Sequence, residues 1–257
     1  MKLVLKTDIP LTFEQLCKKY KLSGDLIYSL VGFSKIKKYQ IINTDIEVEL
    51  PKEESNILPI DEPLNIVYED PYFLVLNKPT NLVCIPTINK KEKSLAGMVI
   101  NYFKNNNISS TAHFVSRLDR NTQGLLIVAK HQYIHHLFSL IKIEKHYKAL
   151  VNGYTEDNGI IETPILRLPH QNERIIDSKG KYCKTIYKTI ERKNNTSLVD
   201  IQLLTGRTHQ IRVHFKSINH CLVGDTLYGD TKGEFFLISY KLSFKHPITN
   251  QQLEFVL

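Results

Sequence analysis

The sequence predicts an α+β fold, built on a mostly antiparallel mixed sheet with flanking helices. Three observations lead to this prediction. Short alternating or fully apolar segments, which are typical of strands, outnumber the helical ones. Between residues 64 and 77, two such segments flank a tight turn at Glu69–Asp70–Pro71. Helical segments occur singly between runs of strands, which favours α+β over a regularly alternating parallel sheet.

Residues 1–60 are expected to form a small N-terminal segment or accessory domain of unknown role, or an extension of the main sheet. The boundary is placed at residues 51–63, where three prolines and a cluster of acidic residues lack periodicity. The main domain is then residues 61–257. The elements expected before the boundary are a strand at 2–6, a helix at 12–20 with Thr12 as its N-cap, and a strand pair at 40–50 around Asn43 and Thr44.

Periodicity predicts the elements that follow the boundary. Three segments repeat apolar side chains at helical spacing, and the others alternate or are continuously apolar. One predicted helix begins after Ser94, and the other two span residues 132–141 and 210–218. The predicted strands lie at 64–77 (a pair), 125–128, 147–151, 185–190, 198–204, 236–244 and 253–257.

Composition favours a polyanionic partner without proving one. The 257 residues carry a formal net charge of +8, with a pI of about 9.1. An excess of basic residues suits RNA, although it also serves solubility. No apolar run approaches membrane length, and the N-terminus does not read as a signal peptide. Four widely spaced cysteines read as reduced thiols. We therefore expect a cytoplasmic monomer that does not enter a membrane.

The most informative motif spans residues 114–130. Asp119 lies between Arg117 and Arg120, and Gly124 precedes an apolar strand. Gly124 suggests a positive φ or a close backbone approach. A carboxylate in a basic loop suits an acid that stays ionised beside an anionic substrate. The alternative is a solvated charge cluster at the end of a strand.

A second cluster spans residues 203–215. Arg207 follows Gly206 at a junction between a strand and a helix, which is equally typical of an ordinary surface arginine. On the helix, Arg212 shares a face with Lys216. The histidines at 209 and 214 are spaced by five and have no nearby carboxylate, so we predict no zinc site. Phosphate-binding glycine loops and a nucleophile elbow are also absent from the sequence.

Taken together, these segments resemble the RluA-type pseudouridine synthase family. The likeness covers residues 65–250 and rests on several motifs that occur in the family's order. The segments that carry it are VYEDPYFLVLNKPTNLVCIPT (67–87), SRLDRNTQGLLIVAK (116–130), KHYKALVNGY (145–154), LLTGRTHQIRVHF (203–215), LVGDTLYGD (222–230) and YKLSFKHPIT (240–249).

The resemblance implies a pseudouridine synthase fold that isomerises specific uridines in ribosomal or transfer RNA to pseudouridine. It makes Asp119 the catalytic carboxylate, either as a nucleophile at C1′ or as a base on the sugar. It implies that Arg207 pairs with Asp119, that Tyr147 stacks on the uracil, and that Arg117 fills the space of the flipped base. The reaction needs no redox change or group transfer from outside, so we expect no cofactor and no metal.

Some positions depart from the family pattern and make the RNA target harder to predict. The carboxylate, the tyrosine and the Gly–Arg pair are all intact. The departing residues are Asn81, Ile85, Ser116, Gln123 and Ile238.

Two alternatives stay open at the level of sequence. One is a non-catalytic RNA-binding protein of the same fold. The other is an unrelated lyase or hydrolase that uses Asp119 as a general acid. It would need a second carboxylate, for which Asp225 and Asp230 are the candidates.

Overall fold

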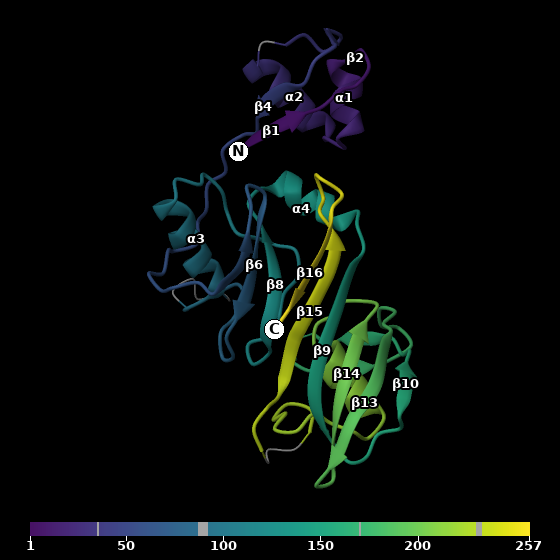
Figure 1. The fold of residues 1–257 in the computed structure, drawn as a ribbon. Coiled ribbons are helices and arrows are strands. Elements are labelled where there is room, and N and C mark those ends of the chain that lie inside the picture. The colour runs from purple at the N-terminus through teal and green to yellow at the C-terminus, as the bar shows by residue number, and fades with distance from the viewer. Residues whose placement is uncertain (35, 87–91, 170, 230–232) are drawn as a thin grey trace.

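A long, mostly antiparallel sheet forms the body of the molecule (Figure 1). The computed structural model describes residues 1–34, 36–86, 92–169, 171–229 and 233–257. The main strand order is β10-β13-β14-β9-β15-β8-β6-β5, with β16 on β15 and β7 on β8. These strands are β5 (Ile66–Glu69), β6 (Phe73–Lys78), β7 (His113–Phe114), β8 (Gln123–Ala129), β9 (Ile143–Asn152), β10 (Asn158–Ile161), β13 (Thr185–Lys193), β14 (Thr196–Leu203), β15 (Leu237–Lys245) and β16 (Gln252–Val256).

The sheet is mixed because β8 and β15 pair in parallel, while the other pairs described in it are antiparallel. At this parallel pair Gly124 has a φ of 108°, and a Cβ atom there would lie 2.2 Å from the carbonyl oxygen of Ser239. Both the positive φ and the close approach predicted for this glycine are thus confirmed. The predicted α+β class is also confirmed.

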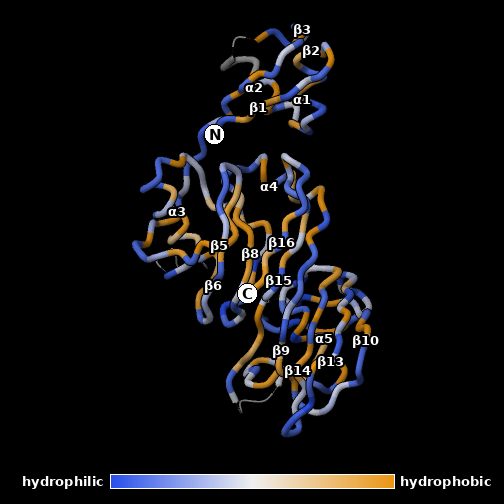
Figure 2. Tube along the Cα trace, viewed as in Figure 1, coloured by the Kyte–Doolittle hydropathy of each residue, from blue (hydrophilic) through white to orange (hydrophobic). Residues whose placement is uncertain are grey.

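Apolar residues cover both faces of the sheet, because neighbouring side chains of a strand point to opposite sides. On β6, Leu74 and Leu76 belong to one apolar cluster and Phe73 and Val75 to the other. The first cluster includes the buried sides of α3 (Leu95–Asn105) and α5 (Gln210–Ser217), and the second that of α4 (Gln132–Ser139). Figure 2 shows hydrophobic segments running along the central strands and α3. All three predicted helices are confirmed within a residue or two at their ends.

Residues 1–50 form two small sheets of their own. They contain β1 (Lys2–Leu5), β2 (Leu11–Thr12), α1 (Phe13–Lys19), α2 (Gly24–Ser34), β3 (Ile41–Ile42) and β4 (Ile46–Glu49). The pairs are β1–β4 and β2–β3, so the predicted pairing of two strands within residues 40–50 is wrong. Each strand instead meets a partner more than 25 positions earlier in the chain, a choice that short-range turn signals do not encode. The helix α2 was not predicted.

The predicted cap of α1 is confirmed. The Thr12 hydroxyl accepts a hydrogen bond from the backbone N–H of Gln15, whose side-chain oxygen accepts one from the Thr12 N–H. This reciprocal pair satisfies two amides that a helix start otherwise leaves open. Buried Phe13, Leu16 and Cys17 lie on the inward side, as the periodicity predicted.

The boundary segment 51–63 contains no helix or strand but is fastened to the body. The Glu53 carboxylate lies 2.7 Å from Nε2 of His113 and accepts a hydrogen bond from the Gln132 backbone. Although burial opposes ionisation, these contacts lower the pKa of Glu53 to about 2. The N-terminal segment also touches the body where the Tyr133 hydroxyl donates to the Tyr20 carbonyl. No helix among the described residues has the length and apolarity to cross a membrane.

Five short strands escaped prediction, and they are β2, β7, β10, β11 (Ile165–Arg167) and β12 (Arg174–Ile176). The hairpin β11–β12 lies beside α5 and contributes Arg174 to the site described next.

Candidate active site

The loop that carries Asp119 joins β7 to β8. It ends in a turn in which the Thr122 N–H donates to the Asp119 carbonyl at 3.1 Å. Gly124 then brings β8 against β15, so the loop emerges beside the strand junction at the centre of the sheet. The apolar run that follows is the fully buried β8, as its composition predicted.

The buried ammonium group of Lys78 fastens the back of this loop. It donates to the carbonyl oxygens of Pro79 and Leu82 at 2.8 Å and of Arg120 at 3.0 Å. The Leu82 N–H also donates to the Arg120 carbonyl, at 3.1 Å. Burial lowers the pKa of Lys78 to about 8, so the ammonium form still predominates at neutral pH.

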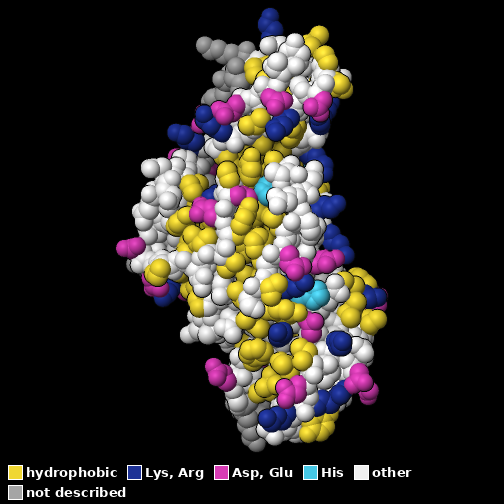
Figure 3. Space-filling view, in the orientation of Figure 1, with side chains coloured by type: hydrophobic (Ala, Val, Ile, Leu, Met, Phe, Trp, Pro, Cys, Tyr) yellow, Lys and Arg dark blue, Asp and Glu magenta, His cyan; other side chains and the backbone are white. Residues whose placement is uncertain are grey.

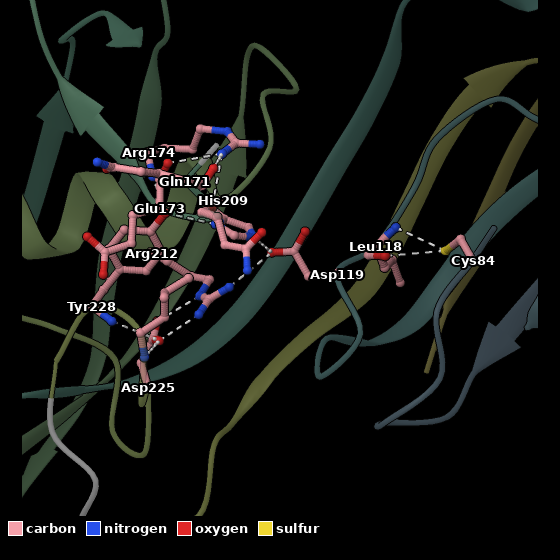
Figure 4. A network of polar contacts seen from close by, with 12 residues as sticks. Cys84, Leu118, Asp119, Gln171, Glu173, Arg174, His209, Arg212, Asp225 and Tyr228 are labelled. Carbon is pink, nitrogen blue, oxygen red and sulfur yellow. Dashed lines mark hydrogen bonds and ion pairs between the residues drawn. The ribbon is translucent and has the colours of Figure 1, made fainter. Parts of the chain in front are cut away.

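The thiol of Cys84 contacts the backbone of Leu118, the residue before Asp119. Cys84 Sγ lies 3.3 Å from the Leu118 carbonyl oxygen and 3.4 Å from its backbone nitrogen (Figure 4). Together with Lys78, this contact fixes the backbone on both sides of Asp119.

The cation beside Asp119 is Arg212, which corrects the prediction of an Asp119–Arg207 ion pair. A guanidinium nitrogen of Arg212 lies 3.6 Å from Asp119 Oδ2, and Nε2 of His209 lies 3.8 Å from the same oxygen (Figure 4). Arg207 is exposed at the edge of the cavity, and its backbone N–H donates to the Gln210 side chain. The chain turns at His209, between Arg207 and α5, and the side chains that approach the carboxylate are those of His209 and Arg212.

A second carboxylate holds Arg212 in place. Asp225 accepts two hydrogen bonds of 2.7 Å from the Arg212 guanidinium, and it also accepts from the backbone of Leu227 and Tyr228. Burial disfavours its charge, but the contacts with Arg212 outweigh burial and lower the pKa of Asp225. Asp225 therefore stays ionised and does not serve as the second acid of a hydrolase. The other candidate, Asp230, lies outside the described residues.

The aromatic ring of Tyr228 supports the same arginine. The guanidinium carbon of Arg212 lies 4.9 Å from the ring centroid, a cation–π distance. The Tyr228 hydroxyl accepts a 2.7 Å hydrogen bond from the Arg174 N–H and lies 2.8 Å from Nδ1 of His209. Residues from β12, α5 and the loop after α5 thus converge behind Asp119.

Asp119 opens into a cavity of about 450 Å³, a size suited to a nucleotide-sized ligand. Among the described residues that line it, Asp119 is the one carboxylate, and five are basic. These five are Arg117, Arg120, Lys145, Arg207 and Arg212. The lining therefore attracts an anionic ligand and presents a single carboxylate to it.

Tyr147 lies on the wall of this cavity, at the middle of β9. It is opposite Ile201 on one side and Ser239 on the other. Burial raises the pKa of Tyr147 to about 12, so the phenol is neutral at physiological pH. Its aromatic ring is 6% exposed and belongs to the apolar cluster under the cavity.

Among the described residues, the two arginines that flank Asp119 in sequence make no ion pair with it. Arg120 forms an ion pair with Glu92. Arg117 is exposed, and no ion pair with it is found within the described part of the chain. The structure thus brings Asp119 and Tyr147 to one cavity, with Arg117 and Arg207 at its lining.

Sequence reasoning missed His209 and Lys145 as site residues and noted Arg212 only for its helical face. The sequence did contain a signal for His209 and Arg212. They are three positions apart at the start of a predicted helix, a spacing that brings side chains together. Lys145 lines the cavity from β9, and burial lowers its pKa. Within the described residues, no group of three or more His, Cys, Asp or Glu is arranged to hold a metal ion.

Comparisons with known proteins agree with this geometry. The family model described as RNA pseudouridylate synthase matches residues 72–217. A Bacillus subtilis protein named uncharacterized RNA pseudouridine synthase YjbO is 36% identical, over 90% of this chain and 86% of the relative. The ribosomal large subunit pseudouridine synthase D of Zymomonas mobilis is 33% identical, over 86% of this chain and 76% of its own.

A solved structure shows the same fold. Human RNA pseudouridylate synthase domain containing 1 superposes with a TM-score of 0.61 at 27% identity, covering 76% of this chain and 83% of the human one. A matching family model over more than half of the chain, with relatives above 30% identity over most of it, shows that the chain belongs to the RNA pseudouridylate synthase family and is an RNA pseudouridine synthase.

Proposed function

We propose that the chain isomerises uridines in ribosomal RNA and that Asp119 is the catalytic carboxylate. The observation that carries the assignment of Asp119 is its position, as the single carboxylate among the described residues of a basic cavity. The ribosomal substrate is supported by relatives named ribosomal large subunit pseudouridine synthase D, at 32–38% identity.

The cavity residues support a sequence of steps for this reaction. A uridine inside folded RNA must leave the base stack before a protein group reaches its sugar. The C1′–N1 bond then breaks, the uracil turns, and C5 bonds to C1′ while C5 loses a proton and N1 gains one. Asp119 acts at the sugar, either by bonding to C1′ or by removing a sugar proton.

Arg212 places a positive charge beside Asp119 for this step. Its guanidinium lies 3.6 Å from the carboxylate, and the bidentate contact with Asp225 prevents it from swinging away. The sequence suggested that Arg207 pairs with Asp119, and we assign this pairing to Arg212 instead. Arg207, at the exposed edge, is then a phosphate contact.

Tyr147 and Arg117 complete the proposal. The neutral Tyr147 ring offers a face on which the uracil stacks. With its pKa raised to about 12, the phenol is a poor base for the C5 proton at neutral pH. Arg117 is free to enter the space left by the flipped base and to contact phosphate.

Asp119→Asn tests the catalytic assignment. The substitution removes the charge but little volume, so folding and RNA binding should persist while pseudouridine formation falls by more than about 100-fold. The measurement is single-turnover pseudouridine formation in transcribed ribosomal RNA, with RNA affinity and thermal unfolding as controls. Formation at more than a few per cent of the wild-type rate contradicts the assignment.

Pseudouridine mapping tests the substrate. Total RNA from cells with and without the protein should differ at uridines of the large-subunit ribosomal RNA. Lost sites confined to transfer RNA would overturn the ribosomal assignment but leave the role of Asp119 intact. The two failures are therefore separable.

A further inference from the structure

His209 occupies a strained backbone position at the start of α5. Its φ of 59° and ψ of 17° are left-handed, which is uncommon for a residue with a side chain. It is the N-cap of the helix, yet its side chain makes no capping hydrogen bond. The imidazole instead lies between Tyr228 and Asp119 (Figure 4). Such strain persists where the surrounding contacts hold it, and it clusters at functional sites.

The hydrogen bonds of Tyr228 favour one position for the proton of the neutral His209 ring. The Tyr228 oxygen already accepts the Arg174 N–H at 2.7 Å. Its single hydroxyl proton is then available for Nδ1 of His209, which lies at 2.8 Å. Accepting this proton leaves Nδ1 without one of its own in the neutral ring. This arrangement favours a proton on Nε2, the nitrogen that faces Asp119.

Nε2 of His209 and the guanidinium of Arg212 approach the same atom. Asp119 Oδ2 is 3.8 Å from the first and 3.6 Å from the second. His209 is the N-cap of α5 and Arg212 lies in the first turn of that helix, so the start of one helix supplies both groups. Figure 4 shows the second carboxylate oxygen of Asp119 turned away from them. The two oxygens of Asp119 thus have different surroundings.

We propose that His209 is a positioning residue of the isomerisation, which donates from Nε2 to Oδ2 of Asp119 and so presents Oδ1 to the ribose. The inference rests on the proposed role of Asp119. The distance of 3.8 Å is longer than a hydrogen bond, and such contacts commonly tighten when substrate closes the site. Fixing one oxygen of a carboxylate limits its rotation, which aligns the other with the reacting atom.

The neutral form of His209 is the one that its surroundings favour. Burial lowers the pKa of His209. The charges around it oppose one another, because Asp119 and Asp225 raise the pKa while Arg212 and Arg174 lower it. A neutral imidazole with its proton on Nε2 is therefore the state in which the residue works at physiological pH.

Two amide substitutions separate this role from a merely structural one. The amide nitrogen of His209→Gln reaches about as far as Nε2 and keeps a donor toward Asp119. The shorter His209→Asn keeps an oxygen near Nδ1 for Tyr228 and suits the left-handed backbone, but its amide nitrogen ends short of Asp119. We expect kcat to fall by about 100-fold in His209→Asn and by less than about 10-fold in His209→Gln, with an unchanged KM for RNA. A structural role predicts the reverse order, so activity in His209→Asn equal to or above that in His209→Gln overturns the proposal.

The control variants keep this test apart from the proposed function. His136→Gln changes an exposed histidine on α4 and should leave kcat unchanged. Asp119→Asn is measured in parallel. If it stays active, the role of Asp119 fails and the proposal for His209 fails with it. If it is inactive, the order of the two His209 variants decides the proposal alone.

A spectroscopic measurement on the wild-type protein tests the proton position without any variant. In protein labelled with ¹⁵N-histidine, NMR distinguishes protonated from unprotonated ring nitrogens. We expect His209 at pH 7 to carry its proton on Nε2 and an unprotonated Nδ1. A proton on Nδ1 alone would overturn the proposal even if both variants failed to fold.

Discussion

Arg212 contacts two carboxylates that differ in their access to the cavity. Asp225, whose side chain is fully buried, binds it with two short hydrogen bonds, while Asp119 stays 28% exposed at a longer distance. Arg212 thus makes its bidentate contact with Asp225, the structural partner, and a longer ion pair with Asp119, the proposed catalytic one. This division explains how Asp119 stays near a cation and yet is free to meet a substrate.

Removing Arg212 should destabilise the protein more than removing Arg207. Arg212→Ala leaves the Asp225 charge buried and unpaired, which costs about 3–5 kcal/mol of unfolding free energy. Arg207→Ala removes an exposed side chain and should cost less than about 0.5 kcal/mol. Arg212→Lys keeps the charge without the two-pronged geometry and should recover only part of the activity. Urea unfolding at pH 7 measures the difference, and equal stability of the two alanine variants would contradict it.

The effect of Arg212→Ala should also depend on pH. The pKa of Asp225 is lowered in the folded wild type, so its ion pair stabilises the fold above the unfolded pKa of about 3.9. That contribution is lost as pH falls through the folded pKa. The stability gap between wild type and Arg212→Ala should therefore be largest near neutral pH and shrink under acid conditions. A gap that grows on acidification would refute the ion pair as its source.

The loop that carries Asp119 depends on two elements that precede it in the chain, β6 and the turn after it. Lys78, the last residue of β6, donates to two carbonyl groups of that turn and to one of the Asp119 loop. Three hydrogen bonds from one ammonium group make the two loops a single unit.

Lys78→Met should therefore reduce both stability and kcat. Unsatisfied buried carbonyls cost about 1–3 kcal/mol, and a loosened loop misplaces Asp119. Lys130→Met is a matched control, because Lys130 is also buried and donates to Glu69 and to the Asp70 carbonyl, but these partners lie outside the Asp119 loop. We expect both variants to lose stability and only Lys78→Met to lose kcat. Equal kcat values would show that the Lys78 contacts do not position the loop.

The pH dependence of Lys78 has a definite sign. Its folded pKa of about 8 is lower than the usual lysine value of about 10.4, so the unfolded chain binds more protons between these limits. Wild-type stability should therefore gain from Lys78 as pH rises from 8 to 10, and Lys78→Met should lack that gain. Denaturant unfolding across this range compares the two proteins.

The parallel junction of β8 and β15 requires glycine at position 124. In Gly124→Ala the new Cβ atom would meet the Ser239 backbone at 2.2 Å, at a φ that costs a side chain about 1–3 kcal/mol by itself. Gly24→Ala is the control, because no atom lies within 4 Å of its Cβ position and alanine favours the helix that begins there. Thermal unfolding should show a large loss for the first variant and none for the second. A stable Gly124→Ala would mean that the two strands separate without cost.

At the scale of the whole molecule, the net charge of +8 is not gathered into one patch on the face shown in Figure 3. Basic and acidic side chains are interspersed there. The described lining of the cavity, by contrast, carries five basic side chains and one carboxylate. The cavity lining comes from residues 83–237, so we assign the chemistry to residues 61–257. The role of residues 1–60 stays open.

RNA affinity should fall steeply with salt, because basic groups that neutralise phosphates release bound counterions. If Arg117 supports base extrusion, Arg117→Ala should weaken activity on a structured RNA more than on a short unstructured one. A plain phosphate contact predicts equal losses and a salt slope reduced by about 1. Lys142→Ala, which removes an exposed lysine paired with Glu144, serves as the control. Affinity and rate on both RNAs at several salt concentrations distinguish the outcomes.

The sequence by itself determined the elements whose signals are local. The Thr12 cap, the apolar faces of α3 and α4, and the glycine at the start of β8 each depend on residues within a few positions, so periodicity and backbone preference predicted them. The motif around Asp119 also identified the family, because several short segments kept their order along the chain.

Only the tertiary structure decided which distant groups meet. The partners of β3 and β4, and the choice of Arg212 over Arg207 beside Asp119, depend on how separate segments pack. Arg207 and Arg212 are five positions apart, and the left-handed turn at His209 between them decides which one faces the carboxylate. Spacing in a sequence does not contain that direction, because side-chain contacts across a fold follow from the packing of all its elements together.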